Sequence, residues 1–226
     1  MSELPFYKVD RQMAGSVARP HIWQPSENTE SSRTLLLLHG TGADEHDLIG
    51  LGKLLDPTAN LLSPRGLVVH QGMARHFLRH DSGEFDEDGI RANSDDLAAF
   101  VADAAREYGF DSSKVWGAGF SNGATALNAL MLQHPELLQG IFAFGTTRSF
   151  KGGDFSNVDL TGKHVFIGNG AQDDYSPADE VAELVGLYQQ LGAQVKLRVH
   201  PGGHTIVIEH VREFASDLLG IDAKPA

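Results

Sequence analysis

The sequence predicts an α/β protein in which helices cover both faces of a mostly parallel sheet. Short apolar segments typical of buried strands alternate with amphipathic helical segments, and this order produces parallel strands joined by helical crossovers. The first such strand, residues 35–38, is wholly apolar and runs into His39 and Gly40. An uninterrupted apolar run is typical of a central strand that is covered on both faces.

Five further strands are expected downstream of this one. They occupy the segments 60–63, 114–119, 140–145, 164–169 and 195–200. In a sheet of this kind the carboxyl ends of the strands share one edge, and ligands bind there. The loops that follow these strands are therefore the places where functional side chains are expected.

Amphipathic helices are predicted between and after the strands. One has apolar residues at helical spacing up to Tyr108, with Ser94 as its N-cap and Gly109 at its end. A second is expected over residues 124–131. A third helix is expected to begin at Ser176 and Pro177 and to end at Gly192. A fourth is expected after His204.

Length and composition favour one domain and exclude several classes of partner. At about 150 residues per domain, 226 residues correspond to a single domain over residues 1–226. The 18 basic and 30 acidic residues give a net charge of −12, the wrong sign for binding nucleic acid. The absence of cysteine excludes disulfides and a cysteine nucleophile. Without a leader-like start or an apolar run near about 18 residues, we expect a cytoplasmic protein with no membrane insertion.

A nucleophile motif lies at the end of the expected strand 114–119. Gly119-Phe120-Ser121-Asn122-Gly123 matches the pattern G-x-S-x-G. The string alone is weak, but here it stands between a strand and a helix, the setting that a nucleophile elbow requires. The two glycines keep side chains away from the neighbouring strand and helix. Ser121 is therefore the candidate nucleophile, and the alternative is a serine that caps a helix at a tight turn.

An activated serine requires two further side chains. A base must take the hydroxyl proton, and a third group must orient the base. Asp173 and His204 follow two later strands in the chain order Ser, Asp, His. Because both loops open at the carboxyl edge of the sheet, these two residues are the predicted partners of Ser121. Two alternatives stay open, namely His200 in place of His204 and Asp174 in place of Asp173.

A glycine-rich loop follows the first strand, with the sequence His39-Gly40-Thr41-Gly42-Ala43-Asp44. Free backbone amides in such a loop can stabilise an oxyanion together with the amide after the nucleophile. We predict that Thr41 and Asn122 supply these two amides. The alternative is a phosphate-binding loop, which is disfavoured because a third glycine and a Gly-Lys-Ser/Thr sequence are both missing.

Together these motifs resemble the phospholipase/carboxylesterase family of the α/β-hydrolase fold, over about residues 34–220. Two more segments sharpen the resemblance. Gly72-Met73-Ala74-Arg75-His76-Phe77-Leu78-Arg79 and Gly83-Glu84-Phe85-Asp86 are similar to the bacterial carboxylesterase branch that is linked to hydroquinone and quinone detoxification.

The resemblance implies a role for each candidate residue. Ser121, Asp173 and His204 form the catalytic triad, Thr41 and Asn122 supply the oxyanion amides, and Met73, Phe77 and Phe85 line the acyl or leaving-group pocket. The family more often has glutamine where Asn122 stands. Asparagine should be tolerated there because the oxyanion hole uses only the backbone amide.

We therefore expect a serine carboxylesterase that hydrolyses small or short-acyl esters through an acyl-enzyme intermediate. Its partner is a small-molecule ester, no cofactor is expected, and a homodimer stays open. Short acyl groups are favoured because no extended apolar stretch resembles a lipid-binding lid. The alternatives are an acyl thioesterase or lysophospholipase of the same family, and a non-catalytic protein that binds a small ligand in the same pocket.

An acidic loop is the remaining candidate feature. It contains Asp81, Glu84, Asp86, Glu87 and Asp88. The spacing matches no calcium-binding loop, so we expect a solvated loop and no metal site.

Overall fold

The computed structural model describes residues 7–10, 12–30, 32–80 and 82–222. Six strands correspond to the predicted ones with small shifts of their ends. They are β3 (Thr34–Leu38), β4 (Asn60–Pro64), β7 (Val115–Phe120), β8 (Gly140–Phe144), β9 (His164–Gly170) and β10 (Gln194–His200). Residues 1–6 and 223–226, at the two ends of the sequence, lie outside the described residues, as does Asp81 of the acidic loop.

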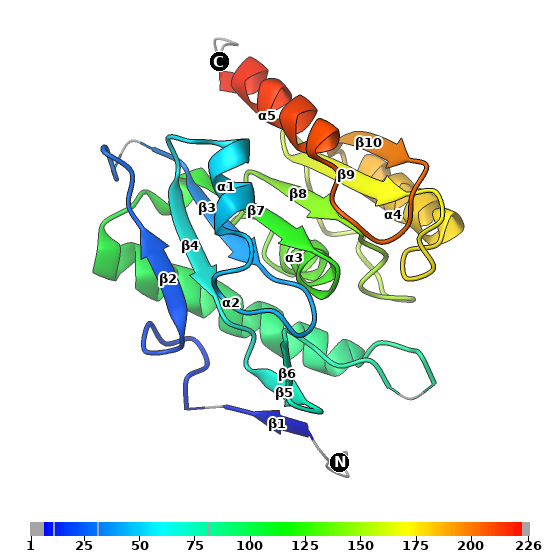
Figure 1. Ribbon diagram of the computed structural model, residues 1–226, viewed down its shortest axis with the longest axis horizontal. Helices are drawn as coiled ribbons and strands as arrows, with labels where there is room; N and C mark the ends of the chain where they lie inside the picture. Colours follow the sequence, from blue (N-terminus) through cyan, green and yellow to red (C-terminus); the bar gives the residue numbers. More distant parts are fainter. Residues whose placement is uncertain (1–6, 11, 31, 81, 223–226) are drawn as a thin grey trace.

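These strands form a seven-stranded sheet together with β2 (His21–Gln24), which the sequence analysis missed. The strand order is β10-β9-β8-β7-β3-β4-β2 (Figure 1). Among the described residues the pairs are parallel, except that β2 runs antiparallel to β4 at the edge. The predicted mostly parallel sheet is therefore confirmed.

Helices cover both faces of the sheet, also as predicted. The helices α2 (Glu87–Tyr108), α3 (Asn122–Gln133) and α4 (Ala178–Gln190) lie on one face, and α1 (Ile49–Leu55) and α5 (Ile208–Asp222) on the other (Figure 1). Leu36 and Leu38 of β3 face the first core, whereas Leu35 and Leu37 face the second. Because successive side chains of a strand point to opposite faces, a strand covered on both sides must be wholly apolar. Within the described part of the chain, no helix combines the length and apolar character that a membrane crossing needs.

The ends of two helices differ from the predicted ones. Helix α2 begins earlier, at an N-cap formed by Asp86, whose Oδ1 accepts the Gly89 amide at 3.0 Å. Ser94 is instead buried inside the helix, and its hydroxyl donates to the carbonyl oxygen of Ile90. The predicted N-cap was therefore wrong, while Gly109 does end the helix in a left-handed conformation.

Helix α4 begins at Ala178, one residue later than predicted. Pro177 takes the N-cap position, and no side chain caps the helix there. The buried hydroxyl of Ser176 has no hydrogen-bond partner among the described residues. The order serine, proline and helix is therefore correct, but Ser176 does not act as the cap.

A second, smaller sheet lies beside the main one (Figure 1). It contains β1 (Tyr7–Val9), β5 (Val68–His70) and β6 (Met73–Arg75), which pair antiparallel in the order β1-β5-β6. Gln71 and Gly72 join β5 to β6, and both have positive φ angles, 52° and 74°. Two such residues in a two-residue loop make the tight hairpin turn that matches the twist of paired strands.

Candidate active site

The predicted site residues follow four different strands and meet at one edge of the main sheet. Thr41 follows β3, Ser121 follows β7, Asp173 follows β9 and His204 follows β10. Since these strands are parallel, their carboxyl ends all open at the same edge.

Ser121 lies in the sharp turn between β7 and α3. Its φ and ψ angles are 54° and −120°, a conformation that side-chain-bearing residues seldom adopt. A Cβ atom on Gly119 would come within 2.8 Å of the Ala124 amide, and one on Gly123 would overlap the carbonyl oxygen of Leu38. Gly119 therefore lets β7 meet the start of α3, and Gly123 lets α3 approach the end of β3. The turn holds the Ser121 hydroxyl above the sheet edge.

His204 contacts the Ser121 hydroxyl directly. The distance from Ser121 Oγ to His204 Nε2 is 2.8 Å, so the hydroxyl can donate its proton to the ring. Phe120 and Tyr175 pack beside the imidazole, with ring centroids 4.8 and 5.1 Å away. These contacts hold the ring in place while leaving it partly exposed to the cavity.

Asp173 orients the far side of the same imidazole. Its Oδ2 atom lies 2.7 Å from His204 Nδ1, and its Oδ1 atom accepts the Tyr175 amide at 2.9 Å. The Asp173 carboxylate is fully buried, whereas the neighbouring Asp174 is exposed. The structure therefore brings Asp173, and not Asp174, to His204.

His200 makes its hydrogen bonds within its own loop, and no contact with Ser121 is present among the described residues. Its Nδ1 atom accepts the Gly202 amide at 3.1 Å, and its Nε2 atom lies 3.3 Å from the carbonyl oxygen of Thr205. A neutral ring with its proton on Nε2 satisfies both contacts. His200 thus shapes the loop that presents His204.

Thr41 and Asn122 line the same space as Ser121. Neither of their backbone amides donates to an acceptor among the described residues. The Asn122 amide is free because it belongs to the first turn of α3, whose N–H groups have no partner within the helix. The loop with Thr41 is held by the Gly42 amide, which donates to the carbonyl oxygen of Ala74 at 2.8 Å.

A cavity of about 860 Å³ opens above Ser121 and His204. This volume lies within the range that is typical of small-molecule sites, about 300 to 1,000 Å³. Its apolar walls include Leu48, Phe77, Phe85, Phe120 and Ile206. Two of the three predicted pocket residues, Phe77 and Phe85, are thus part of the wall.

Met73 does not line this cavity, so its predicted place in the pocket was wrong. Its side chain is 37% exposed, and it lies against Gly42, where an added Cβ would be 3.5 Å from its sulfur. The physical reason is its position beside the tight turn of the β5–β6 hairpin, which carries Met73 outward.

Charged and titratable groups lie in the pocket wall and behind it. Arg75 and Arg79 both line the cavity, Arg75 from a buried position and Arg79 from an exposed one. Burial lowers the pKa of His76 well below its ordinary value, since both ring nitrogens are buried without partners among the described residues. Burial also lowers the pKa of His39, whose ring packs against His76. Both imidazoles are therefore neutral at pH 7.

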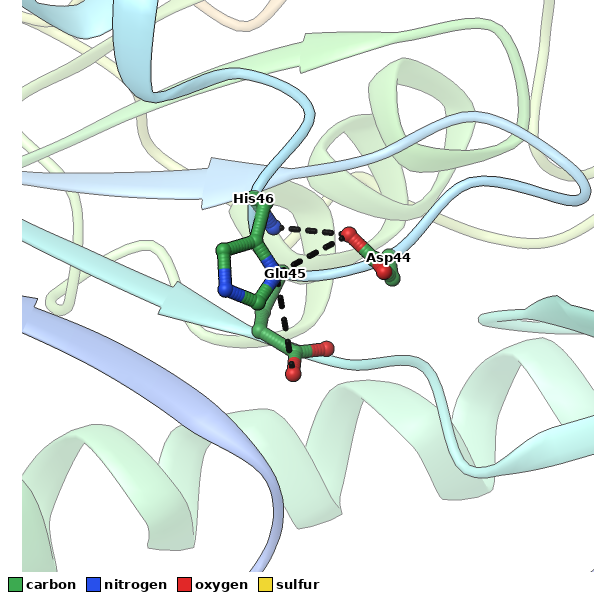
Figure 2. Close-up of side chains that lie close together, drawn as sticks. All are labelled: Asp44, Glu45 and His46. Atoms are coloured by element: carbon green, nitrogen blue, oxygen red, sulfur yellow. Dashed lines mark hydrogen bonds and ion pairs between the residues drawn. The ribbon is translucent and has the colours of Figure 1, made fainter.

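Asp44, Glu45 and His46 form a cluster that the sequence analysis did not single out (Figure 2). Asp44 Oδ1 accepts the His46 amide at 2.9 Å, and this hydrogen bond lowers the pKa of Asp44. Glu45 is engaged elsewhere, because it accepts a hydrogen bond from Arg65 Nη2 at 2.8 Å. A turn and an ion pair account for the cluster, and we assign no metal site to it.

Among the cavity-lining residues without a role predicted from the sequence, three have side chains suited to binding or positioning. They are Arg75, Arg79 and Tyr175. The two arginines belong to the segment that suggested Phe77 as a pocket residue, so the available signal was a charged residue within an expected pocket wall. Tyr175 follows Asp173 by two positions, and its contact with His204 depends on a loop shape that the sequence does not reveal.

Comparisons with known proteins identify the family of the chain. A match to the phospholipase/carboxylesterase family covers residues 20–219. The chain is 35% identical over 197 residues to MhqD of Bacillus subtilis (strain 168), a protein named as a hydrolase, and the match covers 87% of this chain and 96% of MhqD.

Two solved structures of carboxylesterases are also similar. The Bacillus cereus carboxylesterase shares 32% identity with a TM-score of 0.86, covering 92% of this chain and 97% of that one. The Mesorhizobium loti carboxylesterase shares 32% identity with a TM-score of 0.77, covering 86% of this chain and 90% of that one. The chain therefore belongs to the phospholipase/carboxylesterase family and is an ester-hydrolysing enzyme with the α/β-hydrolase fold.

Proposed function

We propose that the protein is a serine carboxylesterase that hydrolyses small or short-acyl carboxylic esters through a Ser-His-Asp triad. The observation that carries the proposal is the continuous line of hydrogen bonds from Ser121 Oγ through His204 to Asp173, at 2.8 and 2.7 Å. A buried carboxylate on one imidazole nitrogen and a serine hydroxyl on the other is the arrangement that activates serine in acyl transfer.

The first half of the reaction forms the acyl-enzyme. Ser121 Oγ attacks the ester carbonyl carbon while its proton moves to His204 Nε2, and the carbonyl oxygen becomes an oxyanion. The free amides of Thr41 and Asn122 donate to that oxygen. The bond from the carbonyl carbon to the alcohol oxygen then breaks, and His204 returns the proton to the departing alkoxide.

The second half releases the acid. Water takes the place of the alcohol, and His204 removes one of its protons as the water oxygen attacks the acyl carbon. The bond to Ser121 Oγ breaks, and the proton returns to the serine. Throughout both halves, Asp173 keeps the proton of His204 on Nδ1 and stabilises the imidazolium that forms.

The size and polarity of the cavity support small esters over long acyl chains. A long acyl chain needs a continuous apolar groove, because burying it is driven by the area of apolar surface removed from water. The cavity instead includes Arg75, Arg79 and Asp47 beside its aromatic wall. A substrate with polar groups near its ester suits this lining better than a lipid chain does.

The test is covalent labelling with a fluorophosphonate, read by intact mass, on the wild type and on Ser121→Ala. We expect one adduct on the wild type and none on the variant, because only an activated serine reacts. Ser112→Ala, at an exposed serine that precedes β7, is the matched control and should keep the adduct. Labelling that persists in Ser121→Ala, or that is absent from the wild type, contradicts the proposal.

A series of p-nitrophenyl esters of increasing acyl length then tests the substrate class. We expect kcat/KM to be highest for short acyl groups such as acetate and butyrate. An optimum at long acyl chains, or preference for the matching thioesters, assigns the chain to thioesterase or lysophospholipase activity instead. Absence of hydrolysis with retained ligand binding supports the non-catalytic alternative. A cytoplasmic location, a single domain and a homodimer stay predictions of the sequence.

A further inference from the structure

Arg75 is a buried cation without a counterion. The residue is 9% exposed, and its Nε atom is buried with no hydrogen-bond partner among the described residues. Across the same part of the chain, its guanidinium makes neither an ion pair nor a stacking contact with an aromatic ring. Burial lowers the pKa of Arg75 from its ordinary value, yet a guanidinium stays protonated at neutral pH.

Such an arrangement is unfavourable unless a partner arrives from outside. Removing a charge from water costs free energy that only an opposite charge or several hydrogen bonds recover. Other arginines of this acidic protein have found carboxylates: Arg33 pairs with Asp56, and Arg65 pairs with Glu45. Arg19 is also deeply buried, but it donates to the carbonyl oxygen of Arg65 and lies over the ring of Phe100.

The position of Arg75 indicates where its missing partner would lie. The residue lines the cavity that also contains Ser121 and His204. The backbone on both sides is tied to the catalytic loops: the carbonyl oxygen of Ala74 accepts the Gly42 amide, and the His76 amide donates to Asn122 Oδ1 at 2.7 Å. These hydrogen bonds fix the backbone around Arg75 relative to the loops that carry Thr41 and Ser121.

We propose that Arg75 binds a carboxylate carried by the substrate, so that the enzyme acts preferentially on esters that bear a free acid group. This inference rests on the proposed esterase function and names its substrate class. The two Nη groups of Arg75 have no hydrogen-bond partner among the described residues, and this end of a planar guanidinium matches a carboxylate in a bidentate pair. The exposed Arg79, which stacks on Phe85 at 4.8 Å, adds positive potential at the rim of the cavity. Asp47, which also lines the cavity, is exposed to solvent that screens its charge.

Two pairs of esters test the proposal, because the acid group can lie on either side of the ester bond. The first pair is 4-acetoxybenzoate and the neutral 4-acetoxybenzamide, with the acid on the alcohol side. The second is monomethyl glutarate and methyl 4-carbamoylbutanoate, with the acid on the acyl side. We expect the wild type to prefer the acid by about 10- to 100-fold in kcat/KM in at least one pair.

Variants assign this preference to Arg75. In Arg75→Gln the ratio of kcat/KM between the acid and the amide should fall to about one, whatever the absolute rate. Arg75→Lys should keep part of the preference for the acid. Arg91→Gln removes a positive charge outside the cavity and should keep the full ratio. A wild-type ratio near one in both pairs, or an unchanged ratio in Arg75→Gln, overturns the proposal. If Arg75→Gln does not fold, the wild-type ratio and the Arg75→Lys variant decide.

A binding measurement separates this proposal from the esterase function. Ser121→Ala, which does not cleave them, is titrated in a calorimeter with both pairs of esters, and so is the Ser121→Ala, Arg75→Gln double variant. In at least one pair we expect the acid to bind more tightly than the amide, and this difference should disappear in the double variant. Hydrolysis without any preference for acids rejects only the role of Arg75. Arg75-dependent binding without a fluorophosphonate adduct rejects only the esterase function.

Discussion

The side chain of Asn122 holds the backbone of His76. Its Oδ1 atom accepts the His76 amide at 2.7 Å, and its Nδ2 atom donates to the carbonyl oxygen of Phe77 at 3.1 Å. The residue after the nucleophile therefore has two separate tasks. Its backbone amide faces the cavity, while its side chain fastens the segment that carries Arg75 and Phe77 to the start of α3. Only the first task could be predicted from the sequence.

Asn122→Ala should weaken the fold and the reaction while sparing the reactivity of the serine. It leaves two backbone groups without partners, and we expect the free energy of unfolding in urea to fall by about 2 to 4 kcal/mol. Displacement of the pocket wall should lower kcat/KM by about 10- to 100-fold. The control is Asn157→Ala at an exposed position, which should change neither. Wild-type stability in Asn122→Ala would show that the two hydrogen bonds contribute little.

Substitutions of the two adjacent aspartates should differ sharply in their effect on kcat. Asp173→Asn keeps the shape of the side chain but loses the charge that fixes the His204 proton on Nδ1, so kcat should fall by about 10⁴-fold. Asp174→Asn, at an exposed site one residue later, should stay within about twofold of the wild type. Steady-state hydrolysis of p-nitrophenyl acetate measures both. Equal losses in the two variants would argue against a direct role for Asp173.

Two glycine-to-alanine substitutions should change the free energy of unfolding in opposite directions. A Cβ on Gly123 would overlap the backbone of β3, so Gly123→Ala should cost at least about 3 kcal/mol of unfolding free energy. Gly186 lies within α4 with no atom within 4 Å of an added Cβ. Gly186→Ala should therefore stabilise the protein by about 0.5 to 1 kcal/mol. Urea unfolding compares them, and a tolerated Gly123→Ala would mean that β3 and α3 can separate.

Stability should fall in mild acid because of His76. Its pKa is lowered in the folded state, so the unfolded chain takes up a proton first as the pH drops below about 6.5. Between pH 8 and pH 5.5 this one group should cost about 1.4 kcal/mol of unfolding free energy. In His76→Phe that share of the pH dependence should disappear, as urea unfolding at both pH values can show. An unchanged slope in the variant would exclude a contribution from His76.

Much of the main sheet could be predicted because its signals are local. A strand buried on both faces is apolar along its whole length, and each of the six predicted strands carries some of this signal. The hairpin β5–β6 was missed because Gln71-Gly72 is not one of the strong turn dipeptides. Helix α1 was missed because it is short and contains Gly50 and Gly52, which disfavour helix.

The meeting of Ser121, Asp173 and His204 could also be predicted, since strand order places their loops at one edge. Their catalytic roles stay a prediction. The importance of Arg75 could not be read from the sequence, because nothing local tells that an arginine is buried or that no carboxylate reaches it. The misplacement of Met73 has the same origin, as the direction of a side chain near a tight turn depends on the turn.

The two sheets support different parts of the site. The large sheet supports the serine, the histidine and the aspartate, while the small antiparallel sheet supports the wall that carries Arg75. Since β1 pairs with β5, which in turn pairs with β6, residues near the start of the chain help to hold that wall. We expect changes in the side chains of the hairpin to alter which esters are accepted, whereas changes in its backbone would also move the loop with Thr41, because the carbonyl oxygen of Ala74 holds that loop. Selectivity can therefore evolve at these side chains while the bond-breaking residues stay as they are.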